Sequence, residues 1–333
     1  MSREKTKKIT SIGGSALIEG IMMRGPKKTT VAVRMGKDDI YTEDISFTGL
    51  TQKHKFCRIP LIRGVCGLID SMRLSYKSLM ISADKAIEAG EIEEEEPSKF
   101  EKWLDDKFGD KLVKILMVFA SIIGVAFAVA LFFFVPSFLY DLVCKVADVG
   151  ESRLFKSVFE GVLKIVLFLG YIVICSRMQE MKRVFMYHGA EHKCINCIEH
   201  GMDLTVDNVR KSSRLHKRCG TSFLLIVMII SIFFFMFIHV DSRVLRLVLR
   251  LVLIPVIAGV SFEFIRLAGR SDNALINLLS KPGLLLQHIT TKEPEDDMIE
   301  VGIASVEAVF DWKTYVEEIR QEDSKEHDIS GSN

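Results

Sequence analysis

The chain has 333 residues, of which 49% are hydrophobic, and its mean hydropathy of +0.25 makes it more apolar than an ordinary soluble domain. A net charge of +1, from 44 basic and 43 acidic residues, removes any whole-chain argument for nucleic acid, and we expect no DNA partner. Seven scattered cysteines and a basic start without an apolar leader are typical of a reduced setting without disulfides. Together these features favour an α-helical integral membrane protein.

Residues 1–89 are predicted to form a small α+β cytoplasmic region. The stretch TTVAVRMGKDDIYTEDISF alternates apolar and polar residues on both sides of a short turn, which predicts a β-hairpin. From Ile59 to Ser82 apolar residues recur at spacings of three and four, which predicts an amphipathic helix. This helix either lies on the bilayer or membrane bundle, or packs on the hairpin, and the pattern allows both.

An acidic linker, residues 90–110, leads from this region to a membrane domain over residues 111–270. About four transmembrane helices are expected in that domain. Residues 115–140 carry no charge and exceed the roughly 20 apolar residues that cross a bilayer core. Residues 219–240 are as clearly apolar, so these two segments are the strongest predicted spans.

Two weaker candidate spans, residues 157–176 and 243–266, contain charged side chains. Glu160 and Lys164 lie four residues apart, so a helix would place them side by side as a neutralised pair. A buried helix of a soluble core is the alternative for both segments. The prediction of four spans therefore depends on these charges being paired or reaching the interface.

The distribution of basic residues predicts the orientation in the membrane. The loop 177–218 contains nine Lys or Arg residues, whereas residues 141–156 contain three. Because basic loops stay on the cytoplasmic side, this loop and both termini are expected to be cytoplasmic. Residues 271–320 predict two cytoplasmic helices around a turn, and residues 321–333 predict a disordered tail.

The cytoplasmic loop contains YHGAEHKCINCIEHG, in which His188, Glu191 and His192 form H-x-x-E-H. On a helix, the spacing of four places both imidazoles on one face, where they can share one zinc ion. Glu191 beside them could then act as general base on a metal-bound water, as in the inverted zincin arrangement. Gly189 inside the motif lowers helix propensity by roughly 1 kcal/mol relative to alanine, which weakens the premise.

Two other interpretations compete with this one. Cys194 and Cys197 form C-x-x-C, which could pair with His216 and Cys219 in a closed structural zinc site. Alternatively, the histidines are simply polar residues of an exposed loop, satisfied by water or lipid headgroups.

Three further residues could complete a metal shell at one depth near the membrane. His216 and Cys219 stand at the cytoplasmic start of the third predicted span. Glu263 lies near the cytoplasmic end of the fourth, where an ionisable residue is a functional candidate. The alternative for Glu263 is a salt bridge to Arg266 or to a lysine of the loop.

Several separated motifs resemble the YqhQ-like bacterial membrane protein family (domain of unknown function 1385). They are GGSALIEGIMMRGP, PLIRGVCGL, HGAEHK, LHKRCGTSF, LIPVIAGVSFE, and PGLLLQHITTKEP followed by IEVGIAS. The resemblance runs from about Ile12 to Phe310, and the family is described as predicted metal-dependent enzymes. It implies a multi-pass protein of the bacterial cytoplasmic membrane. Cys194 and Cys197 are not part of the family's pattern, which places the structural zinc site last among the interpretations.

The residues and the resemblance together predict a metal-dependent, hydrolytic membrane enzyme with a divalent metal such as zinc. Its predicted catalytic base is Glu191, and its predicted metal ligands are His188, His192, His216, Cys219 and Glu263. Four cationic side chains are candidates for holding an anionic substrate group: Arg24, Arg63, Lys193 and Arg218. The alternative is a non-enzymatic scaffold, insertion or transport factor that binds membrane lipid or partner membrane proteins.

Overall fold

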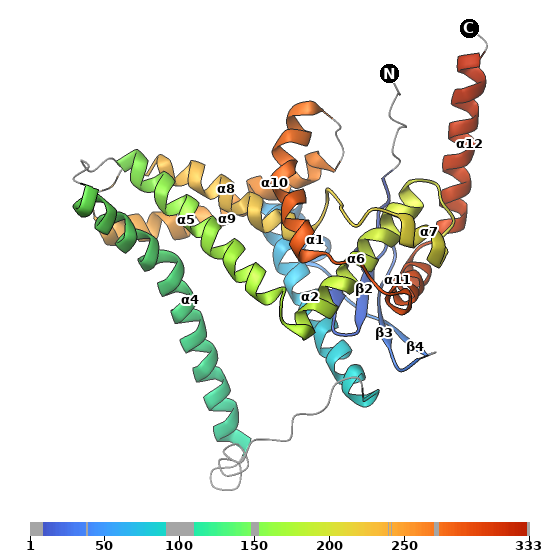
Figure 1. The fold of residues 1–333 in the computed structure, drawn as a ribbon, viewed down its shortest axis with the longest axis horizontal. Coiled ribbons are helices and arrows are strands. Elements are labelled where there is room, and N and C mark those ends of the chain that lie inside the picture. The colour runs from blue at the N-terminus through green and yellow to red at the C-terminus, as the bar shows by residue number, and fades with distance from the viewer. Residues whose placement is uncertain are drawn as a thin grey trace. The chain divides into compact units, whose positions relative to one another are not determined.

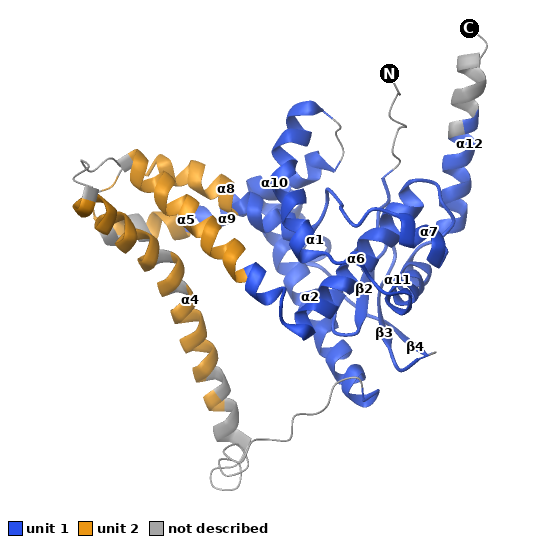
Figure 2. Cartoon of the chain, in the orientation of Figure 1, with its two compact units in different colours: residues 1–92, 172–227, 252–333 blue, residues 93–171, 228–251 orange. Residues whose placement is uncertain are grey.

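The computed structural model describes residues 9–37, 39–90, 110–147, 153–238, 240, 242–269 and 273–331. They fall into two compact units, shown in different colours in Figure 2. Unit 1 comprises residues 1–92, 172–227 and 252–333, and unit 2 comprises residues 93–171 and 228–251. The predicted acidic linker lies outside the described residues, apart from its two end positions.

Unit 1 contains a four-stranded antiparallel sheet in the order of the sequence: β1 (Gly13–Leu17), β2 (Gly20–Arg24), β3 (Thr29–Arg34) and β4 (Ile40–Asp44). The predicted hairpin is confirmed as β3–β4, with Val31 paired to Glu43. The β1–β2 hairpin was not predicted. It turns through Ile18 and Glu19, and Glu19 adopts a positive φ of 50°.

Helices cover both faces of this sheet (Figure 1). Helix α2 (Ile62–Glu88) packs through Leu74 against a cluster that includes Val31 and Val33. Helices α6 (Gln179–Glu199) and α11 (Asp296–Val309) pack on the other face in the larger core. The predicted amphipathic helix is therefore confirmed as α2, and it does pack on the hairpin.

The outer side of α2 exposes the apolar side chains of Ile69, Met72, Tyr76, Leu79 and Met80. Its amino-terminal end packs against the part of α9 (Arg243–Ala268) that belongs to unit 1, since a Cβ on Gly64 would lie 2.9 Å from Phe262 Cβ. One face of α2 thus packs on the sheet, as one interpretation predicted. Another face is apolar and exposed, which is compatible with the other interpretation, a helix that lies on the bilayer or the membrane bundle.

The basic loop 177–218 is mostly helical, and the helix that carries its histidine motif is largely buried, which contradicts the interpretation as an exposed polar loop. All but one of the α6 residues from Phe185 to Glu199 are buried, and the short helix α7 (Val206–Lys211) follows. Gly189 makes the packing possible, since a Cβ there would lie 1.9 Å from the carbonyl oxygen of Lys292. The glycine that weakens the helix is therefore the residue that lets it pack closely.

The remaining elements of unit 1 are short connections and the carboxy-terminal helices. Helix α1 (Leu50–Lys53) and the 3-10 turn η1 (Lys55–Arg58) precede α2. The two predicted helices after the spans are found as α10 (Ala274–Thr290) and α11. Helix α12 (Trp312–Gly331) continues through most of the segment predicted as a disordered tail.

Among the described residues, three helices are long and apolar enough to cross a membrane, over Phe119–Val146, Leu154–Cys175 and Val248–Ala268. They belong to α4 (Asp110–Ala147), α5 (Arg153–Cys175) and α9. The segment predicted as a clear span over 219–240 forms α8 (Gly220–Met236), whose 17 residues fall short of the usual length. The described fold is thus mostly helical, with three candidate spans and one small sheet.

Candidate metal centre

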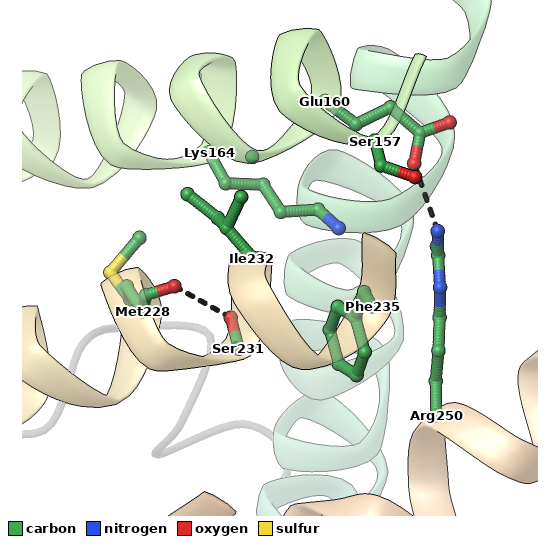
Figure 3. A pocket seen from close by; sticks show the side chains of 9 residues that line it. Ser157, Glu160, Lys164, Met228, Ser231, Ile232, Phe235 and Arg250 are labelled. Atoms are coloured by element: carbon green, nitrogen blue, oxygen red, sulfur yellow. Dashed lines mark hydrogen bonds and ion pairs between the residues drawn. The ribbon is translucent and has the colours of Figure 1, made fainter. Parts of the chain in front are cut away.

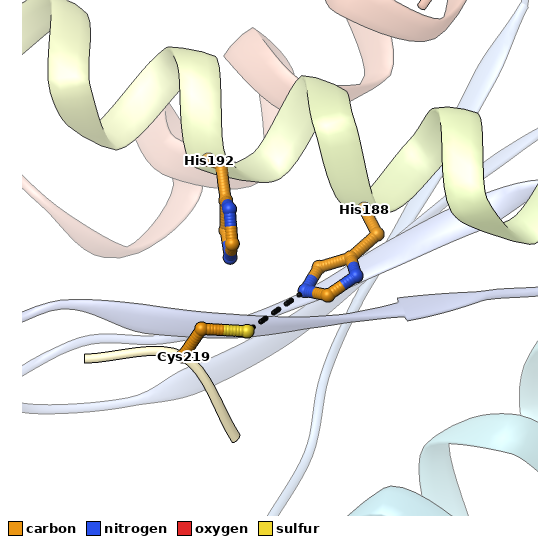
Figure 4. Close-up of side chains that lie close together, drawn as sticks. All are labelled: His188, His192 and Cys219. Atoms are coloured by element: carbon orange, nitrogen blue, oxygen red, sulfur yellow. Dashed lines mark hydrogen bonds between the residues drawn. The ribbon is translucent and has the colours of Figure 1, made fainter. Parts of the chain in front are cut away.

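Two imidazoles and one thiol converge in unit 1 (Figure 4). His188 and His192 project from the same face of α6, and Cys219 directly precedes α8. One ligand atom from each of the three lies within 4.8 Å of the others, and Cys219 Sγ is 3.2 Å from His188 Nε2. The two histidines lie on one face of the helix, as predicted, and the centroids of their rings are 4.4 Å apart.

The far nitrogen of each ring is fixed by a backbone carbonyl. His188 Nδ1 lies 2.9 Å from the carbonyl oxygen of Thr290, and His192 Nδ1 lies 2.6 Å from that of Arg214. Because a carbonyl only accepts, each Nδ1 must carry the proton and donate it. In the neutral rings each Nε2 therefore holds a free lone pair, which is how protein histidines are prepared to bind a metal.

The donor set fits zinc or a similar borderline-soft divalent ion. Zn–S bonds of about 2.3 Å and Zn–N bonds of about 2.0–2.1 Å place tetrahedral ligand atoms about 3.5 Å apart. The Cys219–His188 separation of 3.2 Å is close to this value. Three protein ligands with a fourth position left open are typical of catalytic rather than structural zinc sites.

A cavity of about 90 Å³ adjoins the cluster and would give a bound ion access to a water or a substrate group. Its wall combines the start of β1 with α6 and with the segment before α8. Besides the three ligand candidates, its polar lining includes Glu191, His216 and Arg218.

Glu191 lines this cavity and is held by the first strand. Its Oε1 accepts a hydrogen bond from the backbone N–H of Gly14 at 2.9 Å, and its Oε2 lies 3.6 Å from His192 Nε2. Position 14 must be glycine, because a Cβ there would lie 2.7 Å from Glu191 Cγ. The predicted base is therefore positioned beside the ligands, by a contact that the motif alone does not reveal.

Electrostatics favour the ionised form of the thiol. Burial raises the pKa of Cys219, but the charge and hydrogen bond of His188, with those of His192, outweigh burial and hold that pKa well below its usual range. Burial likewise opposes charging of His192, yet Glu191 and Cys219 raise the pKa of His192 to about 9. These interactions favour the thiolate of Cys219, which is the form that binds metal.

His216 lies beside the cluster but makes structural contacts. Its backbone N–H donates to Gln287 Oε1 at 2.8 Å, and its Nε2 is 3.5 Å from Glu199 Oε2. Glu199 is almost fully buried and also binds Arg218 and the backbone N–H of Thr10. Burial opposes ionisation of Glu199, but His216 and Arg218 overcome it and lower the pKa of this carboxyl to about 2.

Glu263 is engaged elsewhere and does not join the three converging ligands. Its two oxygens accept hydrogen bonds from Arg63 at 2.6 and 2.5 Å, and Arg266 lies 3.9 Å away. The salt bridge to Arg266, which was the alternative prediction for Glu263, is therefore present but is not its main contact. The main partner is an arginine two hundred residues earlier, which joins α2 to α9.

Of the four cationic candidates for substrate binding, only Arg218 lines the cavity. Lys193 is buried, and its ammonium donates to the carbonyl oxygens of Arg210 and Ser212 at 2.8 and 3.0 Å. Arg63 is bound to Glu263, and Arg24 is exposed at the end of β2. These three side chains act in the fold or on the surface rather than in the cavity.

The structural zinc site predicted from C-x-x-C is contradicted by the positions of its cysteines. Cys194 and Cys197 are both part of the large hydrophobic core. A Cβ on Gly302 would lie 2.8 Å from Cys194 Sγ, and Cys197 Sγ lies 3.4 Å from the carbonyl oxygen of Asp203. These thiols face packed helices, because the segment folds as α6 rather than as a knuckle.

Comparisons with known proteins identify a family that is described as having an unknown function. The model of a family described as "Protein of unknown function (DUF1385)" matches residues 59–312. The chain is 34% identical over 312 residues to "Uncharacterized protein YqhQ" of Bacillus subtilis (strain 168), covering 92% of this chain and 93% of that protein. No solved structure matches.

Proposed function

The chain belongs to the DUF1385 family of proteins of unknown function, and we propose that it is a metal-dependent, hydrolytic membrane enzyme. Its divalent ion, zinc by the donor set, is held by His188, His192 and Cys219. The observation that carries this proposal is the orientation of the two imidazoles. Both donate Nδ1–H to backbone carbonyls, so both Nε2 atoms are directed toward the Cys219 thiolate.

The chemistry follows from the groups around the open position. A zinc ion lowers the pKa of a bound water to about 7 when it is present. Glu191 takes the proton of the attacking water, since one of its oxygens is fixed by Gly14 and the other faces the ligands. Arg218, held by Glu199, offers its guanidinium to an anionic group of the substrate.

The site is proposed to work at the cytoplasmic surface of a multi-pass protein of the bacterial cytoplasmic membrane, with both termini cytoplasmic. The excess of basic residues in 177–218 supports this orientation. Within unit 1, Arg63 of α2 binds Glu263 near the end of a candidate span. This contact supports a site at the membrane surface, because it joins an amphipathic helix to a candidate span, and a lipid-linked or membrane-embedded substrate suits the arrangement.

Metal analysis of the purified chain tests the proposal. We expect about one zinc or similar ion per chain, and loss of it in the His188→Ala, His192→Ala double variant. Glu191→Gln should keep the metal but lose cellular function. A variant that keeps both metal and full function would show that Glu191 is not the base, and the hydrolytic mechanism would be abandoned.

A second candidate function, a membrane scaffold or insertion factor, rests on the exposed apolar faces. Besides α2, helix α10 exposes Leu275, Leu278 and Leu285, a surface that lipid or a partner membrane protein could cover. A folded, stable and metal-free protein, whose His188→Ala variant functions normally, would favour this role over the enzyme.

A further inference from the structure

Helix α2 and the turn before it expose charges of one sign only. Residues 50–83 contain six Lys or Arg residues and a single acidic residue, Asp70. The Asp70 carboxylate is buried and accepts a hydrogen bond from the backbone N–H of Leu50 at 2.7 Å, so it contributes no exposed negative charge. The exposed charged side chains of this stretch are therefore all basic: Lys53, Lys55, Arg58, Arg73 and Lys77.

The same stretch also exposes large apolar side chains. Phe56 is 57% exposed and Met72 is 66% exposed, although the opposite face of α2 packs on the sheet through Leu74. The exposed apolar side chains are Phe56, Ile59, Leu61, Ile62, Ile69, Met72, Tyr76, Leu79 and Met80. Together with the five exposed basic side chains they form what we call the α2 surface. Single exposed apolar residues are common, but a series of them along one helix marks an interaction surface.

The start of α2 is attached to a candidate span within the apolar length of that span. A Cβ on Gly259 would lie 2.7 Å from the carbonyl oxygen of Leu61, and Arg63 donates to the Glu263 carboxylate at 2.6 and 2.5 Å. The span ends at Ala268, so at 1.5 Å per residue these contacts lie about 8–14 Å before its end. In a bilayer that this span crosses, the start of α2 therefore lies in the interfacial layer.

The depth and the composition of the α2 surface together select its partner. Apolar side chains are stabilised by acyl chains, and basic side chains are stabilised by the phosphates at the same interface. Helices that combine exposed apolar residues with an excess of Lys and Arg bind bilayers that contain anionic lipid. A soluble protein partner would satisfy the same chemistry, but the attachment to the span favours lipid.

We propose that the α2 surface binds anionic phospholipid of the bilayer. Its apolar side chains insert among the acyl chains, while its lysines and arginines contact the headgroup phosphates. This contact holds unit 1 at the membrane in addition to the span. The inference rests on the proposed membrane location and is independent of the metal centre.

Quenching of tryptophan fluorescence by brominated phospholipids tests this inference in the full chain, reconstituted into bilayers. Trp103→Phe and Trp312→Phe remove the two native tryptophans, and Met72→Trp places one on the α2 surface. We expect brominated acyl chains to reduce its emission about two-fold. In an equal mixture, phosphatidylglycerol should be enriched over phosphatidylcholine beside this tryptophan by roughly five-fold.

Two reporter positions calibrate the quenching. Ile254→Trp, at a half-exposed position of the candidate span in α9, should be quenched in the same way. A chain that keeps only its native Trp312, at the start of α12, should not be quenched. Tyr76→Trp, at a side chain that is 67% exposed on the α2 surface, is a second reporter if Met72→Trp does not fold.

Charge variants test the headgroup contact. With the tryptophan at position 72, Arg73→Gln and Lys77→Gln together should reduce the preference for phosphatidylglycerol to near one while the quenching by brominated chains remains. Lys27→Gln and Lys313→Gln, which remove the same charge from exposed positions outside the α2 surface, should leave the preference unchanged.

The outcomes separate this inference from the proposed function. If Ile254→Trp is quenched but Met72→Trp and Tyr76→Trp are not, the span is in the bilayer and something other than lipid covers α2, which overturns the inference. An equal response to the two lipids, or a preference unchanged in the Arg73→Gln, Lys77→Gln variant, overturns the headgroup contact. Absence of quenching at all three positions overturns the proposed membrane location as well.

Discussion

The candidate metal centre of unit 1 and the ion pair between Glu160 and Arg250 in unit 2 are both largely buried, but they are held in different ways. In the metal centre each imidazole is fixed by a backbone carbonyl, and the nearby carboxylate is fixed by a backbone N–H. In unit 2, by contrast, an ion pair joins two side chains, Glu160 of α5 and Arg250 of α9 (Figure 3). Polar groups fixed by the backbone are organised before a ligand arrives, whereas a contact between two long side chains must order both of them.

The largest effect should come from loosening the backbone support of the metal centre. Gly189→Ala places a Cβ 1.9 Å from the carbonyl oxygen of Lys292, so α6 must move away from the segment that also supplies the Thr290 carbonyl. We expect a loss of about 3–5 kcal/mol in the free energy of unfolding, measured by denaturant titration in mild detergent.

Gly67→Ala is the matched control, since its Cβ would meet Phe262 at an ordinary 3.6 Å within another helix of unit 1. It should change stability by less than about 1 kcal/mol. Equal losses in the two variants would mean that Gly189 has no special packing role.

Glu199→Gln should cost on the order of 3 kcal/mol at pH 7, because the pKa of Glu199 is lowered from 4.5 to about 2 in the folded chain. A lowered pKa stabilises the fold fully above pH 4.5, and this contribution disappears as the pH falls toward 2. The difference between wild type and variant should therefore shrink below pH 4.5. Glu180→Gln, at an exposed position of α6, is the control and should show no such trend.

Cys219→Ser should weaken zinc binding by about 100-fold or more, since it replaces the thiolate ligand. Competition with a chromogenic chelator measures the affinity. Cys175→Ser, at a half-buried cysteine outside the cluster, should bind zinc as the wild type does. Undiminished affinity in Cys219→Ser would remove the thiol from the ligand set.

The smallest effect is expected at an exposed ion pair. Arg210 binds Asp296 at 3.0 and 2.7 Å and joins α7 to α11, yet both side chains are about half exposed. Arg210→Ala should change the free energy of unfolding far less than Glu199→Gln, because exposed pairs are screened by water and salt. A loss as large as that of Glu199→Gln would break the distinction between anchored and exposed polar contacts.

Local patterns in the sequence predict much of the fold. Alternation predicts the β3–β4 hairpin, and apolar periodicity predicts α2. Long apolar runs predict the three candidate spans, while the helix of 17 residues at 220–236 is shorter than its apolar composition suggests. The β1–β2 hairpin escapes prediction because GGSALIEGIMMR lacks a usual turn pair, and Glu19 adopts a positive φ without being glycine.

The candidate site is predicted in part, because local spacing can pair His188 with His192 but cannot show what lies across from them. Tertiary folding brings Cys219 to the two histidines. His216 instead contacts Glu199, and Glu263 forms a salt bridge with Arg63. The glycines at 14 and 189 look like weaknesses in the sequence. The structure shows why they are glycine, because a Cβ at these positions would clash with Glu191 Cγ and with the Lys292 carbonyl oxygen, respectively.

The carbonyl of Thr290 that holds His188 has a consequence for how the protein is made. The ribosome completes this residue only after every candidate span has been synthesised. A nascent chain therefore carries both histidines and the cysteine before the ring of His188 can be held in the orientation that the proposed metal site requires. Assembly of the centre is thereby deferred to a late stage of biogenesis, when the apolar helices have already left the ribosome.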